Sequence, residues 1–153
     1  MVRVRIPASS ANLGAGFDSL GLAVNLYNYV DMEESDGVFI SSTDGTWVPT
    51  TKENLIYQSA QRLYDECGKK LCGLRIIQQN NIPMTRGLGS SSACIVGGLA
   101  AANQMLGNPL GLDDMVGLAS DIEGHPDNTT PALLGGIVTA VLGEGKVFWV
   151  KQE

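Results

Sequence analysis

Alternating hydrophobic and polar residues predict a β-strand at the start of the chain and further strands after it. Aliphatic residues at positions 2, 4 and 6 alternate with arginines at 3 and 5, which is typical of a strand with one solvent-facing side. We expect a loop over residues 7–16 to follow. The other predicted strands cover residues 24–32, 38–42 and 74–79, and a closing hairpin pairs residues 137–142 with 147–150.

Helical periodicity predicts three helices between these strands. Thr50 to Glu53 have the spacing of a capping box, and hydrophobic residues at 56, 60, 63 and 67 then recur at helical intervals. Residues 90–105 are apolar nearly all round, so we expect them to form a central buried helix. A third helix is predicted over residues 113–123, ending at Gly124. Helices and strands mixed in this order predict the α+β class.

Composition indicates one globular domain without a nucleic-acid partner. The 153 residues are 44% hydrophobic and 17% charged, and neither a linker nor an internal repeat divides them. The formal net charge is −6, so there is no basic stripe to bind the phosphates of a nucleic acid. Any anionic ligand must therefore be held by local geometry.

Cysteine count and hydropathy favour a cytoplasmic protein. Three cysteines are an odd number with no disulfide framework, and one histidine cannot complete a usual zinc site. The first seven residues lack the apolar core of a signal peptide. Residues 87–112 carry no formal charge, but their serines, glycines and amides predict a buried helix rather than a membrane span.

A glycine-rich segment before the central helix is a candidate phosphate site. Gly87, Leu88 and Gly89 precede three serines at the start of the predicted helix. Backbone N–H groups converge at such a loop, the helix dipole adds partial positive charge, and no Cβ blocks the approach of an anion. The chain lacks Gly-x-x-x-x-Gly-Lys-Ser/Thr, and the segment lacks the third glycine of the dinucleotide fingerprint. From these residues alone, a serine-capped helix after a tight turn is an equal alternative.

Three segments resemble the GHMP kinases (galactokinase, homoserine kinase, mevalonate kinase and phosphomevalonate kinase). The Pro-x-x-x-Gly-Leu-Gly-Ser-Ser pattern of residues 83–91 resembles their nucleotide loop. Residues 7–18 resemble the N-terminal signature of the homoserine kinases in particular. Residues 123–128, Glu-Gly-His-Pro-Asp-Asn, and 131–136, Pro-Ala-Leu-Leu-Gly-Gly, resemble the same branch. The resemblance implies the GHMP N-terminal fold over residues 1–153, a two-layer, ribosomal-protein-domain-like arrangement of a mixed sheet packed with helices.

The resemblance also implies a set of site residues for ATP and Mg²⁺, in which Ser91 and Glu123 ligate the metal. Glu123 is unusual by itself, because a carboxylate in the last turn of a helix meets the negative end of the helix dipole, at a cost of about 0.3–1 kcal/mol. A solvated surface glutamate is the alternative. The predicted nucleotide-binding residues are Asn54, Pro83, Met84, Thr85, Arg86, Gly87, Leu88, Gly89, Ser90, Ser91, Ser92 and Ala93.

The substrate end of the site is predicted in two further segments. Asp18 is the one charged residue within residues 8–28, and beside Asn12 in a glycine-rich loop it suits a substrate ammonium. An aspartate turn that closes its own backbone is the alternative. His125 and Asn128 would lie near the predicted metal ligands and offer neutral hydrogen-bonding groups. The predicted catalytic residues are Asn12, Asp18, Glu123, His125 and Asn128.

Together these features predict phosphorylation of the L-homoserine hydroxyl by ATP, a step of threonine biosynthesis. No general base stands out, and the resemblance implies catalysis by positioning and Mg²⁺, with Asp18 the one nearby carboxylate that could act as a base. The alternatives are another GHMP kinase, of the mevalonate or sugar type, and a nucleotide-binding fragment without activity. A serine hydrolase is disfavoured because no Gly-x-Ser-x-Gly elbow occurs.

The kinases that the chain resembles are longer, which implies a second, C-terminal domain outside residues 1–153. The resemblance implies that this domain holds the arginines that bind the substrate carboxylate, and this chain has no arginine after Arg86. We therefore expect residues 1–153 alone to lack appreciable homoserine kinase activity. We also expect an exposed apolar face that favours self-association, with a homodimer as one arrangement.

Overall fold

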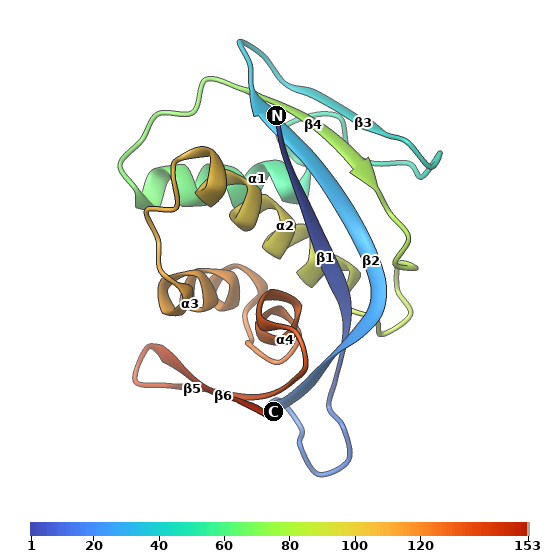
Figure 1. Cartoon of the computed structure of the whole chain (residues 1–153), viewed down its shortest axis with the longest axis vertical. Coiled ribbons are helices and arrows are strands. Elements are labelled where there is room, and N and C mark those ends of the chain that lie inside the picture. The colour runs from blue at the N-terminus through green and yellow to red at the C-terminus, as the bar shows by residue number, and fades with distance from the viewer. Residues whose placement is uncertain (153) are drawn as a thin grey trace.

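The computed structural model describes residues 1–152, which form one curved sheet and a layer of helices on one of its faces (Figure 1). The strands are β1 (Val2–Ala11), β2 (Leu20–Glu34), β3 (Phe39–Ser42), β4 (Leu74–Gln79), β5 (Ile137–Gly143) and β6 (Lys146–Gln152). The helices are α1 (Leu55–Glu66), α2 (Ser90–Met105), α3 (Leu112–Glu123) and α4 (Thr129–Leu134). This arrangement confirms the predicted two-layer α+β class.

Strand β2 organises the sheet because it has three partners. It pairs with β1 along one edge, and with β5 and β4 at the two ends of the other edge. The order along the sheet is β3-β4-β2-β5-β6, and β3 runs parallel to β4 whereas the other pairs are antiparallel. The sheet is therefore mixed, as predicted, and the predicted bounds of β4 and α2 are also confirmed.

The first strand is longer than predicted. β1 continues to Ala11 and β2 already begins at Leu20, so the loop predicted over residues 7–16 is wrong in its first part. The register between the two strands shifts between Pro7 and Ala8, where Asn25 and Leu26 of β2 have no partner on β1. Proline has no N–H to donate, and β1 tolerates this because it is an edge strand that pairs with β2 on one side. The strand can therefore continue beyond the proline.

Helix α2 is the buried centre of the molecule, as predicted. Its core side chains include Ile95 and Leu99, which are at most 2% exposed. Helix α1 packs closely against it, because a Cβ on Gly98 would lie 2.4 Å from the backbone oxygen of Ile56. Only a glycine allows this approach. Helix α2 is thus held between the sheet and α1, and its N-terminus has a fixed position.

Helix α1 is capped by Asn54, so the capping box predicted at Thr50–Glu53 is wrong. The Asn54 side-chain oxygen accepts a hydrogen bond from the backbone N–H of Ile56 at 3.0 Å, and its amide donates to the Pro49 carbonyl at 2.9 Å. Asn54 is 2% exposed. Its contact with a nucleotide stays a prediction, and such a contact would compete with the cap.

Asn54→Ala is expected to lower the free energy of unfolding by about 1–2 kcal/mol, because the first turn of α1 loses its cap. Chemical denaturation followed by circular dichroism measures the change. Asn54→Ser is the control, since its hydroxyl can still accept from the backbone N–H of Ile56 and it should lose less stability. Equal losses in the two variants would show that the cap contributes nothing.

Helices α3 and α4 position the last predicted segment. Helix α3 begins within a residue of its predicted start and ends at Gly124, which adopts a left-handed φ of 96°. Helix α4 has no counterpart among the predicted elements, because its six residues are too few to show helical periodicity. Its N-cap is Asn128, one of the predicted site residues.

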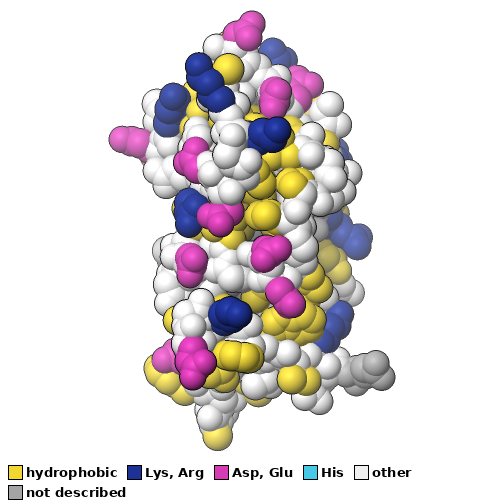
Figure 2. Space-filling view, turned by 90° about the vertical axis from the view of Figure 1, so that its left-hand side faces the viewer, with side chains coloured by type: hydrophobic (Ala, Val, Ile, Leu, Met, Phe, Trp, Pro, Cys, Tyr) yellow, Lys and Arg dark blue, Asp and Glu magenta, His cyan; other side chains and the backbone are white. Residues whose placement is uncertain are grey.

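The surface over the helices carries charges of both signs. Figure 2 shows Lys and Arg side chains interspersed with Asp and Glu on this face, with hydrophobic side chains exposed between them. The β5–β6 hairpin adds exposed hydrophobic residues, and Val141, Phe148 and Val150 are 52%, 59% and 63% exposed. Self-association through such a surface stays a prediction. Within residues 1–152, no helix has both the length and the hydropathy to span a membrane.

Candidate functional site

The glycine loop has an unusual backbone that opens onto the start of α2. Thr85, Gly87 and Gly89 adopt φ values of 58°, 70° and 65°, in the left-handed region. A β-branched residue such as threonine rarely adopts this conformation, so its surroundings must impose it. Gly89 is the N-cap of α2 and provides no side-chain hydrogen bond. The first backbone N–H groups of α2 are therefore left for a ligand, as an anion site requires.

The loop divides into an exposed rim and a buried base. Residues 83–87 are exposed, whereas Leu88 packs against the hydrophobic core. Ser92 and Ala93 are each 1% exposed, so their side chains face the interior. Ser91, which directly precedes them, is exposed. A bound phosphate would therefore meet the backbone of the loop and the Ser91 hydroxyl.

Glu123 accepts hydrogen bonds from two serines at the start of α2. Ser91 Oγ donates to Glu123 Oε1 at 2.7 Å, and Ser92 Oγ donates to the same oxygen at 3.2 Å. Glu123 is the last residue of α3, where the left-handed Gly124 ends the helix. The structure thus brings together the two residues predicted to bind Mg²⁺, which are 32 positions apart in the chain.

The Ser91–Glu123 pair fits Mg²⁺ by the chemistry of its donors. Mg²⁺ prefers hard oxygen ligands and is usually held by one or two protein groups, with water and substrate phosphates completing its shell. Within residues 1–152, no group of three or more His, Cys, Asp and Glu side chains could hold a metal by itself. A metal at this pair would therefore depend on phosphate oxygens, and Mg²⁺ binding here stays a prediction.

Cys94 lies beside this pair as a neutral thiol. Burial first, and the Glu123 carboxylate second, raise the pKa of Cys94 to about 11. The thiol is therefore protonated at neutral pH and is not a nucleophile.

His125 is paired with a buried carboxylate that sequence reasoning missed. His125 Nδ1 forms a hydrogen bond with Asp127 Oδ1, and Asp127 is 2% exposed whereas His125 is exposed. Asp127 thereby orients the imidazole, and Nε2 is the ring nitrogen that can face a ligand. A Cβ on Gly21 of β2 would lie 2.0 Å from the Asp127 backbone oxygen, so this segment is pressed against the sheet. The His-x-Asp spacing is the signal that could have identified Asp127.

Asn128 is tied to the glycine loop through Ser9, a second residue that was not predicted. Ser9 Oγ donates to Asn128 Oδ1 at 3.0 Å, and the Ser9 backbone N–H donates to the Leu88 carbonyl at 3.1 Å. Nothing local in the sequence distinguishes Ser9 from its neighbouring serine. The contact brings together the three segments that resemble the GHMP kinases.

Asn12 and Asp18 are held to each other in the β1–β2 loop. Asn12 Oδ1 accepts a hydrogen bond from the Asp18 backbone N–H at 2.8 Å, and both residues have left-handed φ values, of 59° and 54°. Among residues 1–152, neither forms a hydrogen bond or an ion pair with the glycine loop or with residues 123–128. Their loop follows Ser9 of β1, which bonds to Asn128, and precedes Gly21 of β2, which lies against the Asp127 backbone. It therefore borders the site, and its contact with substrate stays a prediction.

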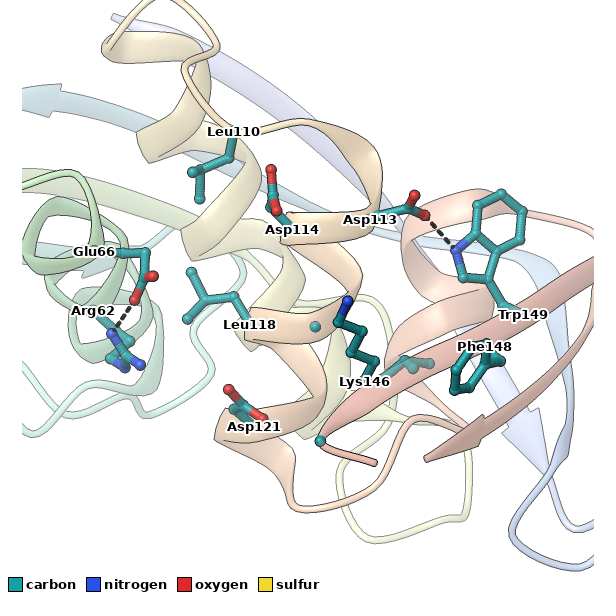
Figure 3. A pocket seen from close by; sticks show the side chains of 13 residues that line it. Arg62, Glu66, Leu110, Asp113, Asp114, Leu118, Asp121, Lys146, Phe148 and Trp149 are labelled. Carbon is teal, nitrogen blue, oxygen red and sulfur yellow. Dashed lines mark hydrogen bonds and ion pairs between the residues drawn. The ribbon is translucent and has the colours of Figure 1, made fainter. Parts of the chain in front are cut away.

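A separate cavity lies between α1, α3 and the β5–β6 hairpin. Its volume is about 830 Å³. In Figure 3 the Trp149 indole donates to Asp113, at 2.9 Å. On the α1 side of the cavity, Arg62 pairs with Glu66 at 2.8 Å. None of its lining residues belongs to the three segments that resemble the GHMP kinases, so this cavity is not the predicted site.

Comparison with known proteins places these segments in one family. Residues 54–136 match the model of the GHMP kinases N terminal domain. The homoserine kinase of Caldicellulosiruptor bescii is 50% identical over 153 residues, which are 99% of this chain and 50% of that protein. The homoserine kinase structure from Cytophaga hutchinsonii has a TM-score of 0.81 at 32% identity and covers 98% of this chain and 51% of that one. The mevalonate kinase of Methanococcus jannaschii, with a TM-score of 0.73 at 18% identity over 99% of this chain and 56% of that one, shares the fold.

The chain spans about half the length of the curated relatives it matches. The family model covers α1, the glycine loop, α2, α3 and α4, and so includes both Ser91 and Glu123. It extends over more than half of the chain. This protein therefore belongs to the GHMP kinase family and contains its N-terminal domain.

Proposed function

We propose that the protein is an ATP-dependent kinase that phosphorylates the hydroxyl of L-homoserine to give O-phosphohomoserine. The observation that supports this most is the 2.7 Å contact between Ser91 Oγ and Glu123 Oε1 beside the uncapped N-terminus of α2. Phosphoryl transfer needs a site for the phosphates, oxygen ligands for Mg²⁺ and an oriented acceptor. The first two requirements have candidates in these residues.

The residues of this chain would act mainly by position. Backbone N–H groups of the glycine loop and of the first turn of α2 bind phosphate oxygens, while Ser91 and Glu123 hold Mg²⁺. When bound, Mg²⁺ neutralises charge that develops on the phosphates. His125 and Asn128 orient the acceptor hydroxyl, whose oxygen forms the new bond to the γ-phosphorus as the bond from that phosphorus to ADP breaks. The hydroxyl proton is released, and we propose Nε2 of His125, whose Nδ1 is bonded to Asp127, as its acceptor.

Two observations favour homoserine over a mevalonate or sugar substrate. Asn12 and Asp18 offer an amide and a carboxylate at the border of the site, which suit an ammonium group that mevalonate and sugars such as galactose lack. Identity to a homoserine kinase is 50%, whereas identity to a mevalonate kinase of the same fold is 18%. Both favour an amino-acid alcohol.

ATP consumption by the full-length protein tests this function. With Mg²⁺ present, kcat/KM for L-homoserine is expected to exceed the values for mevalonate, galactose and shikimate by about 100-fold or more. Asp18→Asn should raise the KM for homoserine by about tenfold or more, because the partner of the ammonium group loses its charge. A preference for another alcohol would overturn the substrate, and the absence of turnover with all four would overturn the kinase function.

A further inference from the structure

We propose that Ser9 is a positioning residue that sets the orientation of the Asn128 carboxamide in the phosphoryl-transfer site. This inference rests on the proposed kinase function and deepens it. Ser9 lies in β1, whereas Asn128 is the N-cap of α4, 119 positions later in the chain. Ser9 is not among the residues placed on phosphate, metal or substrate, so it would act through Asn128.

Ser9 is buried at the point where three segments meet. Its exposed fraction is 0%. Its side chain donates to Asn128 Oδ1 at 3.0 Å, and its backbone N–H donates to the Leu88 carbonyl at 3.1 Å. A buried hydroxyl without its partner would cost about 1–3 kcal/mol, so the fold maintains this contact.

The hydrogen bond determines which end of the Asn128 carboxamide is offered to the site. A carboxamide has an oxygen that accepts and an NH₂ group that donates. Because Ser9 holds Oδ1, the NH₂ group of Asn128 is directed away from Ser9 and is available as a donor. A donor suits the oxygens of an acceptor hydroxyl or of a transferring phosphoryl group. Without Ser9 the carboxamide could rotate and present its oxygen, which would repel them.

The glycine loop leaves space for the same hydroxyl. A Cβ on Gly89 would lie 2.2 Å from Ser9 Oγ and 3.3 Å from Asn128 Oδ1. Gly89 is also the N-cap of α2, at the predicted phosphate site. The missing side chain at Gly89 thus makes room for the Ser9–Asn128 hydrogen bond. The loop and the Asn128 carboxamide are aligned with each other through Ser9.

A double-mutant cycle with Ser9→Ala and Asn128→Ala in the full-length protein tests this role. Ser9→Ala is expected to lower kcat about 10- to 100-fold, as is typical of residues that hold a site residue in place by a hydrogen bond without contacting the substrate. Its backbone N–H bond to Leu88 is retained, so the Kd of a non-hydrolysable ATP analogue should change less than about threefold. In the Asn128→Ala background, Ser9→Ala should lower kcat no further. Ser10→Ala, at the next position of β1, is the matched control and should leave kcat unchanged.

Additive effects in the cycle, or wild-type kcat in Ser9→Ala, would overturn the proposal. The side-chain amide NMR signal of Asn128, identified by its loss in Asn128→Ala, gives a readout independent of turnover. Ser9→Ala should shift this signal and Ser10→Ala should not. If the wild-type protein phosphorylates no alcohol, the proposed kinase function is wrong. If the Asn128 signal does not shift in Ser9→Ala, the proposed role of Ser9 is wrong, whatever the turnover. Ser9→Cys, of similar size with a weaker donor, provides the same comparisons if Ser9→Ala does not fold.

Discussion

Glu123→Gln in the full-length protein is expected to lower kcat about 100- to 1,000-fold while the protein stays folded. Glutamine keeps the size of the side chain and one oxygen that can accept from Ser91, but it removes the negative charge of the proposed Mg²⁺ ligand. Glu123 also ends α3, where a carboxylate meets the negative end of the helix dipole. The free energy of unfolding of the variant should therefore equal that of the wild type or exceed it by up to about 1 kcal/mol. Initial rates at saturating substrates and thermal unfolding measure the two effects.

Neighbouring side chains supply the controls for this prediction. Asp121 is an exposed carboxylate two positions earlier on α3, and Asp121→Asn should leave kcat unchanged. Ser91→Ala should lower kcat more than Ser92→Ala, because the buried Ser92 bonds to Glu123 without being exposed to a ligand. Wild-type turnover in Glu123→Gln would remove Glu123 from the metal site. A large loss of stability in the same variant would show that the carboxylate is structural.

The sequence predicts those helices and strands whose hydrophobic pattern lies entirely within the element itself. Helix α2 and strand β4 have the bounds expected from the sequence, because the long apolar run of α2 and the short isoleucine-containing run of β4 can each be recognised within their own residues. The sequence does not identify the cap of α1, because the capping-box spacing of Thr50–Glu53 directly precedes Asn54 and suggests an earlier helix start. The extension of β1 beyond Pro7 depends on its pairing with β2, which no local pattern shows.

The candidate site divides in the same way. The glycine loop and the Glu123–Asn128 segment are recognisable as motifs, and the structure brings Ser91 and Glu123 into contact. Ser9 and Asp127 were not predicted, because each acts by holding another site residue in place. A buried serine bonded to a residue 119 positions away looks like any serine in a strand. Asp127 has at least the His-x-Asp spacing as a sequence signal, whereas the role of Ser9 is visible only in the folded chain.

Gly89→Ala is expected to weaken ATP binding by the full-length protein about tenfold or more, or about 1.4 kcal/mol. A residue with a Cβ pays about 1–2 kcal/mol for the left-handed φ of 65° at this position. The added Cβ would also lie 2.2 Å from Ser9 Oγ, in space that the buried Ser9–Asn128 hydrogen bond occupies. The loop must shift to relieve this clash, and its N–H groups then lose their alignment. Isothermal titration with a non-hydrolysable ATP analogue measures the affinity.

Two comparisons separate the clash from the cost of the backbone conformation. Gly107, after the other end of α2, has a φ of 83° and no atom within 4 Å of an added Cβ, so Gly107→Ala should lose stability but keep its ATP affinity. Ser9→Ala removes the atom nearest the Cβ. The free energy of unfolding lost by the Ser9→Ala/Gly89→Ala double variant should therefore be smaller than the sum of the single losses. Strict additivity would mean that Gly89 is needed for its backbone conformation alone and that the space it leaves for Ser9 is unimportant.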